Sequence, residues 1–400
     1  MSENNNSLKY KVLFGGGAIR GVAYCGAYKA IEELGVTFDT LAGSSVGAVF
    51  AGLIAVGYSP EETKEIMFQV NYELFKDIQF GIGSQFALCK GEVFLDWLRE
   101  LIEKKFYGKS YKKGKNKAVT FSDLEKNLVI ITTDLSNFEC KEFSKKTTPD
   151  FEVATAIRIS SGMPGLMKPY EYNNTLLTDG DIQKSAPMWS LTKTLQTGSE
   201  RTLELRLEGN FQGNEHNMVE FINALYSYAT STGTKFLTDL YGMCDDYDYI
   251  VIDTGDLNIV DFNLSEEKRK ALVHQGYKQT KSYLTKNLKE KKQYLLKIYN
   301  EILKNVDLFI KNIRNNKILE AKVNLGELYM ELCENINCIN HSEKDDLTKL
   351  KNLFNENLKE PLLFGQLKIE NRTLIEAQSK LCKKNIQKRI SEYEEFIGVK

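Results

Sequence analysis

The sequence predicts an α/β fold over about its first 260 residues and an all-helical region at residues 290–400. Up to residue 260, short apolar strand-like runs alternate with helical segments, which indicates a largely parallel sheet. Five of the six prolines lie in the first half of the chain. From about Ser265, glycine becomes rare and apolar residues recur three and four positions apart between lysines and glutamates. This second pattern is typical of a helical bundle or hairpin array.

Individual elements follow from local patterns. An Ala-rich helix is expected to end at Gly35, and "SPEE" (Ser59–Glu62) and "SDLE" (Ser122–Glu125) predict capping boxes that open helices. Strands are expected at Tyr10–Phe14, Leu128–Thr133, Thr175–Thr178, Thr202–Leu207 and Tyr249–Asp253.

Composition narrows the class of protein. The 400 residues are 42% hydrophobic, and the net charge of −1 gives no overall field that would attract nucleic acid. Seven cysteines without regular spacing favour a reducing compartment. The N-terminus is polar, and the longest apolar run, Val46–Val56, is too short to span a bilayer. We therefore expect a cytoplasmic protein that could still act peripherally on a membrane.

Two segments allow a second interpretation. Cys333, Cys338 and His341 could hold a metal ion, but their spacing fits no standard zinc pattern, so buried thiols are favoured. The basic stretch Lys104–Val119, with Tyr107 interleaved, could rest on an anionic membrane surface. A solvated loop is the simpler interpretation of that stretch.

Three successive glycines, Gly15–Gly17, lie between a strand and a helix and predict a site for a negatively charged group. A dinucleotide fingerprint fails, because Arg20 stands where its third glycine is required. A P-loop fails as well, because Val22 stands where lysine is required. The other possibility is an oxyanion that forms during a reaction.

The stretch Gly43–Gly47 has the pattern G-x-S-x-G between a short apolar run and a compact apolar helix. A serine at such a strand-to-helix turn needs small neighbours two residues to either side, because a Cβ atom would clash there. The turn places Ser45 at a helix N-terminus, where developing negative charge is favoured. Ser45 is the candidate nucleophile.

The base is less obvious. The chain has three histidines, and a Ser–His–Asp triad could use them only poorly: His216 lies in a polar stretch and His274 on a helical one. A carboxylate is the alternative. Asp179 ends a predicted strand and precedes Gly180, so it could accept the serine proton; the pair could also be an ordinary turn.

Together these motifs resemble the patatin-like phospholipases. "GGGAIRG" from Gly15, G-x-S-x-G around Ser45 and Asp179-Gly180 fall in the order and at the spacing of that family. The stretches "TFSDLEKNLVIITTDL" and "ATAIRISSGMPGLMKP" agree with it, and the resemblance covers roughly residues 8–287.

The resemblance implies a three-layer α/β/α fold and a Ser45–Asp179 dyad without metal or cofactor. It also implies an oxyanion hole formed by the backbone N–H groups of Gly15, Gly16 and Gly17. Arg20 matches the family's basic position, where it would hold the loop or lie near a lipid phosphate. Gly43, Gly47 and Gly180 would support the two turns.

Two departures from the family pattern stand out. Asp181 follows Asp179-Gly180 where glycine or alanine is usual, and Ser185 stands before Ala186-Pro187 where asparagine is frequent. A second carboxylate beside the dyad would raise the pKa of Asp179 by like-charge repulsion, or reduce activity. Neither change removes a catalytic group.

The resulting expectation is a serine acyl hydrolase that cleaves phospholipid or lysophospholipid esters, with acyl transfer as an open variant. Residues 8–287 would be the catalytic domain. Residues 290–400 would be a helical domain that binds a protein partner or a membrane. The alternative is a catalytically weak lipase scaffold whose C-terminal helices recruit a protein.

Overall fold

The structure is a computed structural model that describes residues 9–70, 77, 87–183, 188, 191–196, 201–209, 224, 244–257, 264–335, 339, 341–359 and 368–398. The chain divides into two units, which are described separately. Unit 1 comprises Met1–Gly242 and Tyr247–Tyr283, and unit 2 comprises Met243–Asp246 and Leu284–Lys400.

A mixed sheet is the frame of unit 1, with the strand order β10-β9-β1-β2-β4-β8-β7 and β5 paired to β4. All pairings from β10 to β4 are parallel, whereas β4–β8, β8–β7 and β4–β5 are antiparallel. Its strands are β1 (Lys9–Phe14), β2 (Thr37–Gly43), β4 (Asn127–Asp134), β5 (Glu139–Ser144), β7 (Tyr170–Tyr172), β8 (Thr175–Asp179), β9 (Arg201–Glu208) and β10 (Tyr247–Asp253). A separate two-stranded sheet pairs β3 (Ala87–Cys89) with β6 (Gly165–Met167).

Two tight turns account for two of the three antiparallel pairings, β4–β5 and β7–β8. Between β4 and β5, the Asp134 carboxylate accepts hydrogen bonds from the N–H groups of Ser136 and Asn137. Between β7 and β8, Asn173 and Asn174 both have positive φ, as a two-residue hairpin turn requires. Both turns fold the chain straight back, which forces antiparallel pairing. The expectation of a largely parallel sheet therefore holds for the strands from β10 to β4.

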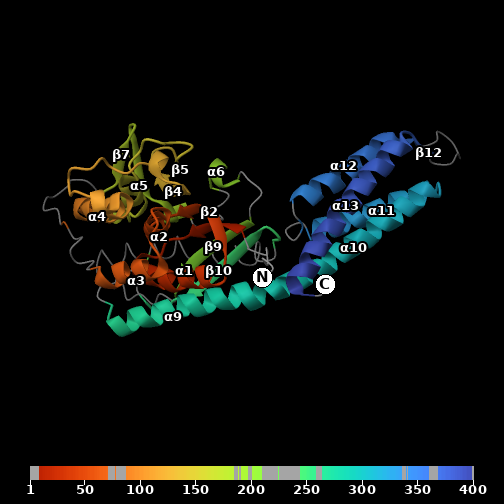
Figure 1. Ribbon diagram of the computed structural model, residues 1–400. Helices are drawn as coiled ribbons and strands as arrows, with labels where there is room; N and C mark the ends of the chain where they lie inside the picture. Colours follow the sequence, from red (N-terminus) through yellow and green to blue (C-terminus); the bar gives the residue numbers. More distant parts are fainter. Residues whose placement is uncertain are drawn as a thin grey trace. The chain divides into compact units, whose positions relative to one another are not determined.

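Helices and apolar segments cover both faces of this sheet, so unit 1 has three layers (Figure 1). On one face, Phe14 of β1 packs edge-on against Tyr24 of α1, which packs against Phe50 of α2. On the other face, strand residues including Leu13 and Val129 form a buried cluster with Met188 and Leu195. The helices of unit 1 are α1 (Ala23–Glu33), α2 (Val46–Ala55), α3 (Pro60–Gln69), α4 (Glu92–Tyr107), α5 (Val153–Ser160), α6 (Lys193–Gln196) and α9 (Glu266–Ser282).

The predicted capping boxes had different outcomes. Ser59 and Glu62 form the predicted box at the start of α3, with hydrogen bonds in both directions. The box predicted at Ser122–Glu125 is wrong. Thr120 and Asp123 form the box instead, at the short 3₁₀ helix Phe121–Asp123, because the same spacing of a hydroxyl and a carboxylate occurs two residues earlier.

Unit 2 is helical, as the sequence predicts (Figure 1). A π-helical turn (Tyr283–Asn287) leads into α10, whose buried side chains recur three and four residues apart. Phe309 of α10 packs edge-on against Phe354 of α12, and both belong to one continuous apolar core. The elements are α10 (Leu288–Arg314), α11 (Ile318–Glu334), α12 (His341–Asn357), the short strands β11 (Leu358–Lys359) and β12 (Lys368–Ile369), and α13 (Arg372–Ile397).

The structure describes parts of the two segments that allowed a second interpretation, the one with Cys333 and the basic stretch Lys104–Val119. The Cys333 thiol is exposed, so the expectation of a buried thiol is wrong there; Cys338 and the His341 side chain lie outside the described residues. In the basic stretch, Lys104 and Lys113 both pair with Glu100. Within the part of the chain that the structure describes, no helix is long and apolar enough to cross a membrane.

Candidate active site

The turn between β2 and α2 holds Ser45 in a strained conformation. Ser45 is the N-cap of α2, with φ 53° and ψ −129°, a region that residues other than glycine rarely occupy. Such strain persists only where the surroundings fix the backbone, and it is typical of functional sites. The turn lifts the serine side chain away from the strand and places it at the start of a helix, as the pattern G-x-S-x-G predicts.

The two glycines of the pattern permit this turn because the chain passes very close to itself. A Cβ atom on Gly43 would lie 2.3 Å from the carbonyl oxygen of Gly47. A Cβ atom on Gly47 would lie 2.0 Å from the carbonyl oxygen of Phe14. The obstructing atoms are backbone atoms that cannot move aside, so both positions require glycine.

Ser45 and Asp179 are in direct contact. The Ser45 hydroxyl donates to Oδ2 of Asp179 over 2.8 Å, and both side chains are buried. Asp179 is the last residue of β8, and its Oδ1 accepts a hydrogen bond from the N–H group of Asp181 at 2.8 Å. The carboxylate is therefore fixed by one oxygen and presents the other to the serine, which suits proton transfer.

Two serines that the sequence motifs did not mark hold the backbone of Ser45. The N–H group of Ser45 donates to Ser160 Oγ at 3.0 Å, and Ser160 Oγ donates to the Ile131 carbonyl at 2.6 Å. Ser161 Oγ donates to the Ser45 carbonyl at 3.1 Å. These serines belong to the stretch "ATAIRISSGMPGLMKP", so the family resemblance of that stretch was the available signal.

The three glycines of the loop after β1 differ in their hydrogen bonding. The Gly15 N–H donates to the Leu205 carbonyl at 2.9 Å, and the Gly16 N–H donates to Asp181 Oδ1 at 2.9 Å. Gly17 has φ 153° and precedes the 3₁₀ helix Ala18–Val22. Among the described residues, the N–H groups of Gly17 and Ala18 have no hydrogen-bond acceptor. Of the three glycines expected to donate to an oxyanion, Gly15 and Gly16 thus have N–H groups that are engaged within the protein.

Asp181 connects this loop to the turn that carries Ser45. Besides the Gly16 N–H, its Oδ1 accepts the Ser44 hydroxyl at 3.0 Å and Arg206 Nη1 at 3.1 Å. Asp181, the residue that departs from the family pattern, is thus buried and joins the glycine loop, the Ser45 turn and β9 through hydrogen bonds. Its charge is matched by Arg206, so the carboxylate expected to repel Asp179 is held in an ion pair.

Arg206 lies in β9, and no motif in the sequence marked it. Burial alone would lower its pKa, but the ion pairs with Glu204 and Asp181 raise it, so the guanidinium stays charged. Glu204 accepts Arg206 Nε at 2.6 Å and the Tyr247 hydroxyl at 2.8 Å. The network is fully buried, and each charge in it has a partner, as burial requires.

Arg20 has a structural contact. Its Nε and Nη2 donate to the Leu257 carbonyl at 3.0 Å and 2.6 Å, which supports the first of its two expected roles, holding the loop. Gly180 is also close to the sheet, since a Cβ atom there would lie 2.1 Å from the Ile131 carbonyl oxygen. His274 is an exposed residue of α9, and His216 and Ser185 lie outside the described residues.

The buried contact between Ser45 and Asp179, the strained turn at Ser45 and the glycine loop all lie on a three-layer α/β/α unit. The family model of the patatin-like phospholipases matches residues 12–191, so this part of the chain is a patatin-like phospholipase domain. The match indicates a lipid ester hydrolase and a role in lipid metabolism.

Individual relatives agree with this assignment. The chain is 28% identical over 296 residues to an uncharacterized protein of Acanthamoeba polyphaga mimivirus, which covers 71% of this chain and 96% of that protein. It is also 28% identical over 185 residues to a protein of Invertebrate iridescent virus 6 named "Probable lipid hydrolase", covering 45% of this chain and 62% of that protein.

Among solved structures, VipD from Legionella pneumophila has a similar fold, with a TM-score of 0.50 and 15% sequence identity. The alignment covers 96% of this chain and 88% of VipD. At this identity, the similarity concerns the fold alone.

Proposed function

We propose that this protein is a metal-independent serine acyl hydrolase that cleaves carboxylic esters of phospholipids or lysophospholipids. The hydrogen bond from Ser45 Oγ to Asp179 Oδ2, 2.8 Å long and buried, is the observation that carries the proposal. It places a hydroxyl and a base in contact at a helix N-terminus, which are the parts that nucleophilic acyl transfer needs. The match of residues 12–191 to the patatin-like phospholipase model supports a lipid ester as the substrate.

The reaction has two halves. Ser45 Oγ attacks the ester carbonyl while Asp179 accepts its proton, and the tetrahedral intermediate collapses to an acyl-enzyme. The leaving alcohol takes the proton from Asp179. A water molecule then attacks the acyl-enzyme, Asp179 accepts a proton from this water and returns it to Ser45, and the fatty acid leaves.

The oxyanion would be bound by the glycine loop. Since the N–H groups of Gly15 and Gly16 are engaged, the donors in this proposal are the N–H groups of Gly17 and Ala18. A donor of this kind typically contributes about 10²–10³ in rate. Gly15 and Gly16 would shape the loop rather than bind the substrate.

We extend the proposal to the organisation of the chain. The catalytic domain would end near residue 287, and residues 290–400 would be a separate domain that controls access to Ser45 through a protein partner or a membrane. A helical face with Leu319, Val323 and Met330, all more than half exposed, supports a partner for α11. The protein would work in the cytoplasm and reach its lipid substrate peripherally.

Product analysis tests the proposal. The full-length protein is incubated with mixed phospholipids and lysophospholipids beside Ser45→Ala, and products are identified by mass spectrometry. We expect free fatty acid from the wild type and none from the variant. EDTA should not inhibit, because a serine and backbone donors perform the chemistry.

Two other outcomes of this experiment would indicate a different function. Acyl groups found on a second lipid would indicate acyl transfer. No product from a correctly folded wild type, with or without a recruited partner, would support the alternative of a weak lipase scaffold.

A further inference from the structure

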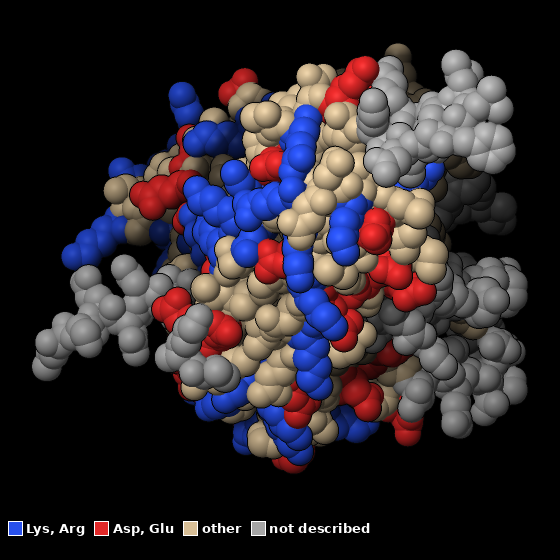
Figure 2. Space-filling view, turned by 90° about the vertical axis from the view of Figure 1, so that its right-hand side faces the viewer, with Lys and Arg blue, Asp and Glu red and all other residues tan. Residues whose placement is uncertain are grey.

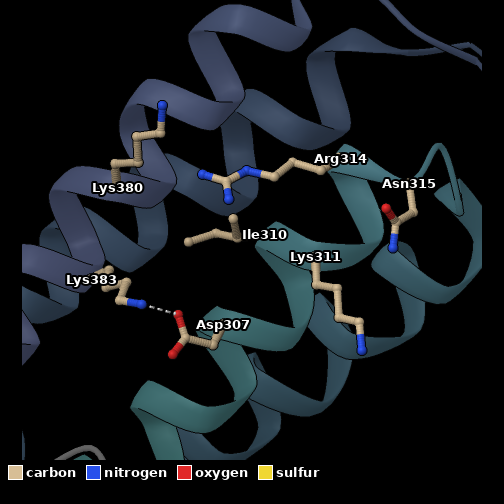
Figure 3. Close-up of a pocket in the computed structure, with 7 residues that line it drawn as sticks. All are labelled: Asp307, Ile310, Lys311, Arg314, Asn315, Lys380 and Lys383. Atoms are coloured by element: carbon tan, nitrogen blue, oxygen red, sulfur yellow. Dashed lines mark ion pairs between the residues drawn. The ribbon is translucent and has the colours of Figure 1, made fainter.

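A hollow of about 260 Å³ lies in unit 2 between α10 and α13. Its lining residues all belong to unit 2 and include none of the residues that the proposed hydrolysis uses, so that reaction gives the hollow no role. Figure 3 shows its lining side chains, which include Asp307, Ile310, Lys311, Arg314, Lys380 and Lys383.

The lining carries a strong excess of positive charge. Four of its side chains are cationic and one is a carboxylate. Lys383 pairs with Asp307 at 2.7 Å. Among the described residues, Lys311, Arg314 and Lys380 take part in no ion pair, so three positive charges line the hollow without a compensating carboxylate.

Helix geometry explains only half of this cluster. Lys311 and Arg314 lie in the last turn of α10, where cations are favoured by the helix dipole. Lys380 and Lys383 lie in the middle of α13, far from either helix end, so the dipole does not account for them. Like charges on two facing helices repel one another, and a bound anion would relieve that repulsion.

The arrangement of the side chains fits an anion with several oxygen atoms. In Figure 3, the Arg314 side chain extends from α10 toward α13 beside Ile310, which is buried at 6% exposure. The planar guanidinium of Arg314, next to an apolar side chain, presents paired N–H donors. This arrangement binds two phosphate oxygens at once. Lys380 lies across from Arg314 on α13 and can add a point charge, whereas the Lys311 side chain points away from Arg314 (Figure 3). Figure 2, which faces the right-hand side of Figure 1, shows many Lys and Arg side chains through the middle of that view, with Asp and Glu side chains among them.

We propose that this hollow, the α10–α13 basic pocket, binds the phosphate group of an anionic ligand through Arg314 and Lys380. The phosphate can belong to a soluble phosphorylated molecule or to a phosphate-monoester lipid headgroup, since both present the same oxygens. The pocket is a second site, distinct from Ser45, and its ligand binding does not depend on the proposed hydrolysis.

Binding measurements on the full-length chain test this proposal. Pyrophosphate is titrated into the protein by isothermal calorimetry at low salt. Arg314→Gln should weaken binding about tenfold, because it removes a charged pair of hydrogen bonds. Arg314→Lys, which keeps the charge without the fork, should lie between. Lys297→Gln is the matched control: it removes an exposed lysine of α10 about 26 Å from Arg314 toward the start of the helix, at 1.5 Å per residue, and should leave binding unchanged.

A second arm identifies the source of the phosphate. Vesicles of phosphatidylcholine with and without phosphatidic acid are sedimented with the Ser45→Ala protein, which prevents turnover. Pyrophosphate binding in solution supports a soluble ligand, and binding to phosphatidic acid vesicles that Arg314→Gln loses supports a headgroup. Equal weakening by Lys297→Gln and Arg314→Gln would overturn the proposal, as would no binding in either arm. Circular dichroism of each variant shows that a loss is not a loss of folding.

Discussion

Asp181 contacts three parts of the candidate active site at once. Its backbone N–H fixes the Asp179 carboxylate, and its own carboxylate holds Gly16 and Ser44. The resemblance to the family marked Asp181 only as an unusual residue. Its contacts make it a positioning residue: it touches the neighbours of each reacting group and would act through them.

We expect Asp181→Ala to lower kcat about 100-fold with little change in KM, because misplaced reacting groups slow the chemistry more than substrate binding. Asp181→Asn keeps an acceptor for Gly16 and Ser44 and should restore most of the rate. Steady-state kinetics on a lysophospholipid, with thermal unfolding of both variants, checks this. Equal rates for Asp181→Ala and the wild type would show that Asp181 has a structural role only.

Cysteine reactivity should separate the buried thiols from the exposed one. Burial raises the pKa of Cys25 and of Cys382 to about 12, so at pH 8 only about one thiol in 10⁴ of either kind is a thiolate. The pKa of each thiol is 9.0 without burial and about 12 in the folded protein. Their contribution to folding stability is therefore complete below about pH 9 and is lost as the pH rises toward 12. Iodoacetamide at pH 8 should therefore label Cys333 in minutes and leave Cys25 and Cys382 unlabelled. Peptide mass spectrometry reads the pattern, and rapid labelling of Cys25 would contradict it.

At the scale of elements, the sequence predicts the parts whose signal is local. The strand expected at Leu128–Thr133 is present as Asn127–Asp134, because continuous apolar residues mark a strand buried on both faces. β5 and β7 were not predicted, since their sequences are mostly polar and only partners bring them into the sheet. The serine elbow and Asp179 were predictable from motifs. Arg206 and the engaged N–H groups of Gly15 and Gly16 were not, because they depend on β9 and Asp181, far away in sequence.

Two glycine substitutions, one in the turn that carries Ser45 and one in α11, form a matched pair. Gly47→Ala should strongly destabilise unit 1, because the new Cβ atom would lie 2.0 Å from the Phe14 carbonyl oxygen. Gly326→Ala in α11 meets no atom within 4 Å and should stabilise its helix by about 0.5–1 kcal/mol, since alanine loses less backbone entropy. Thermal unfolding of the two variants measures both effects. A stable, active Gly47→Ala protein would show that the backbone of the Ser45 turn can move to accommodate the Cβ atom.

At the scale of the whole molecule, the chain contributes to unit 2 from two places. Met243–Asp246 belongs to unit 2 although the residues on either side belong to unit 1. Within unit 2, Asp245 is buried and pairs with Lys292 at 2.8 Å, and Arg389 lies 3.6 Å away. Removing the helices would therefore leave the Asp245 carboxylate without its cationic partners. An unpaired buried charge costs free energy unless water reaches it.

A truncated chain tests whether unit 2 is a regulatory domain. We expect residues 1–288 carrying Asp245→Asn, which removes that unpaired charge, to be soluble and to hydrolyse a small soluble ester. The same protein should lose the pyrophosphate binding that the α10–α13 basic pocket provides. Light scattering, ester hydrolysis and calorimetry read the three properties. If this variant aggregates while the full-length Asp245→Asn protein folds, the helices belong to the catalytic core and the regulatory proposal should be dropped.

The central claim is that Ser45, activated by Asp179, forms a covalent intermediate. A fluorophosphonate reacts only with an activated serine and leaves a mass that can be assigned to one residue. The full-length protein is treated with the reagent, digested and analysed by mass spectrometry beside Asp179→Asn. The account predicts a single modified residue, Ser45, labelled at least about 100-fold more slowly when the base is replaced. Labelling of another serine, or equal labelling of Ser45 in Asp179→Asn, would contradict it.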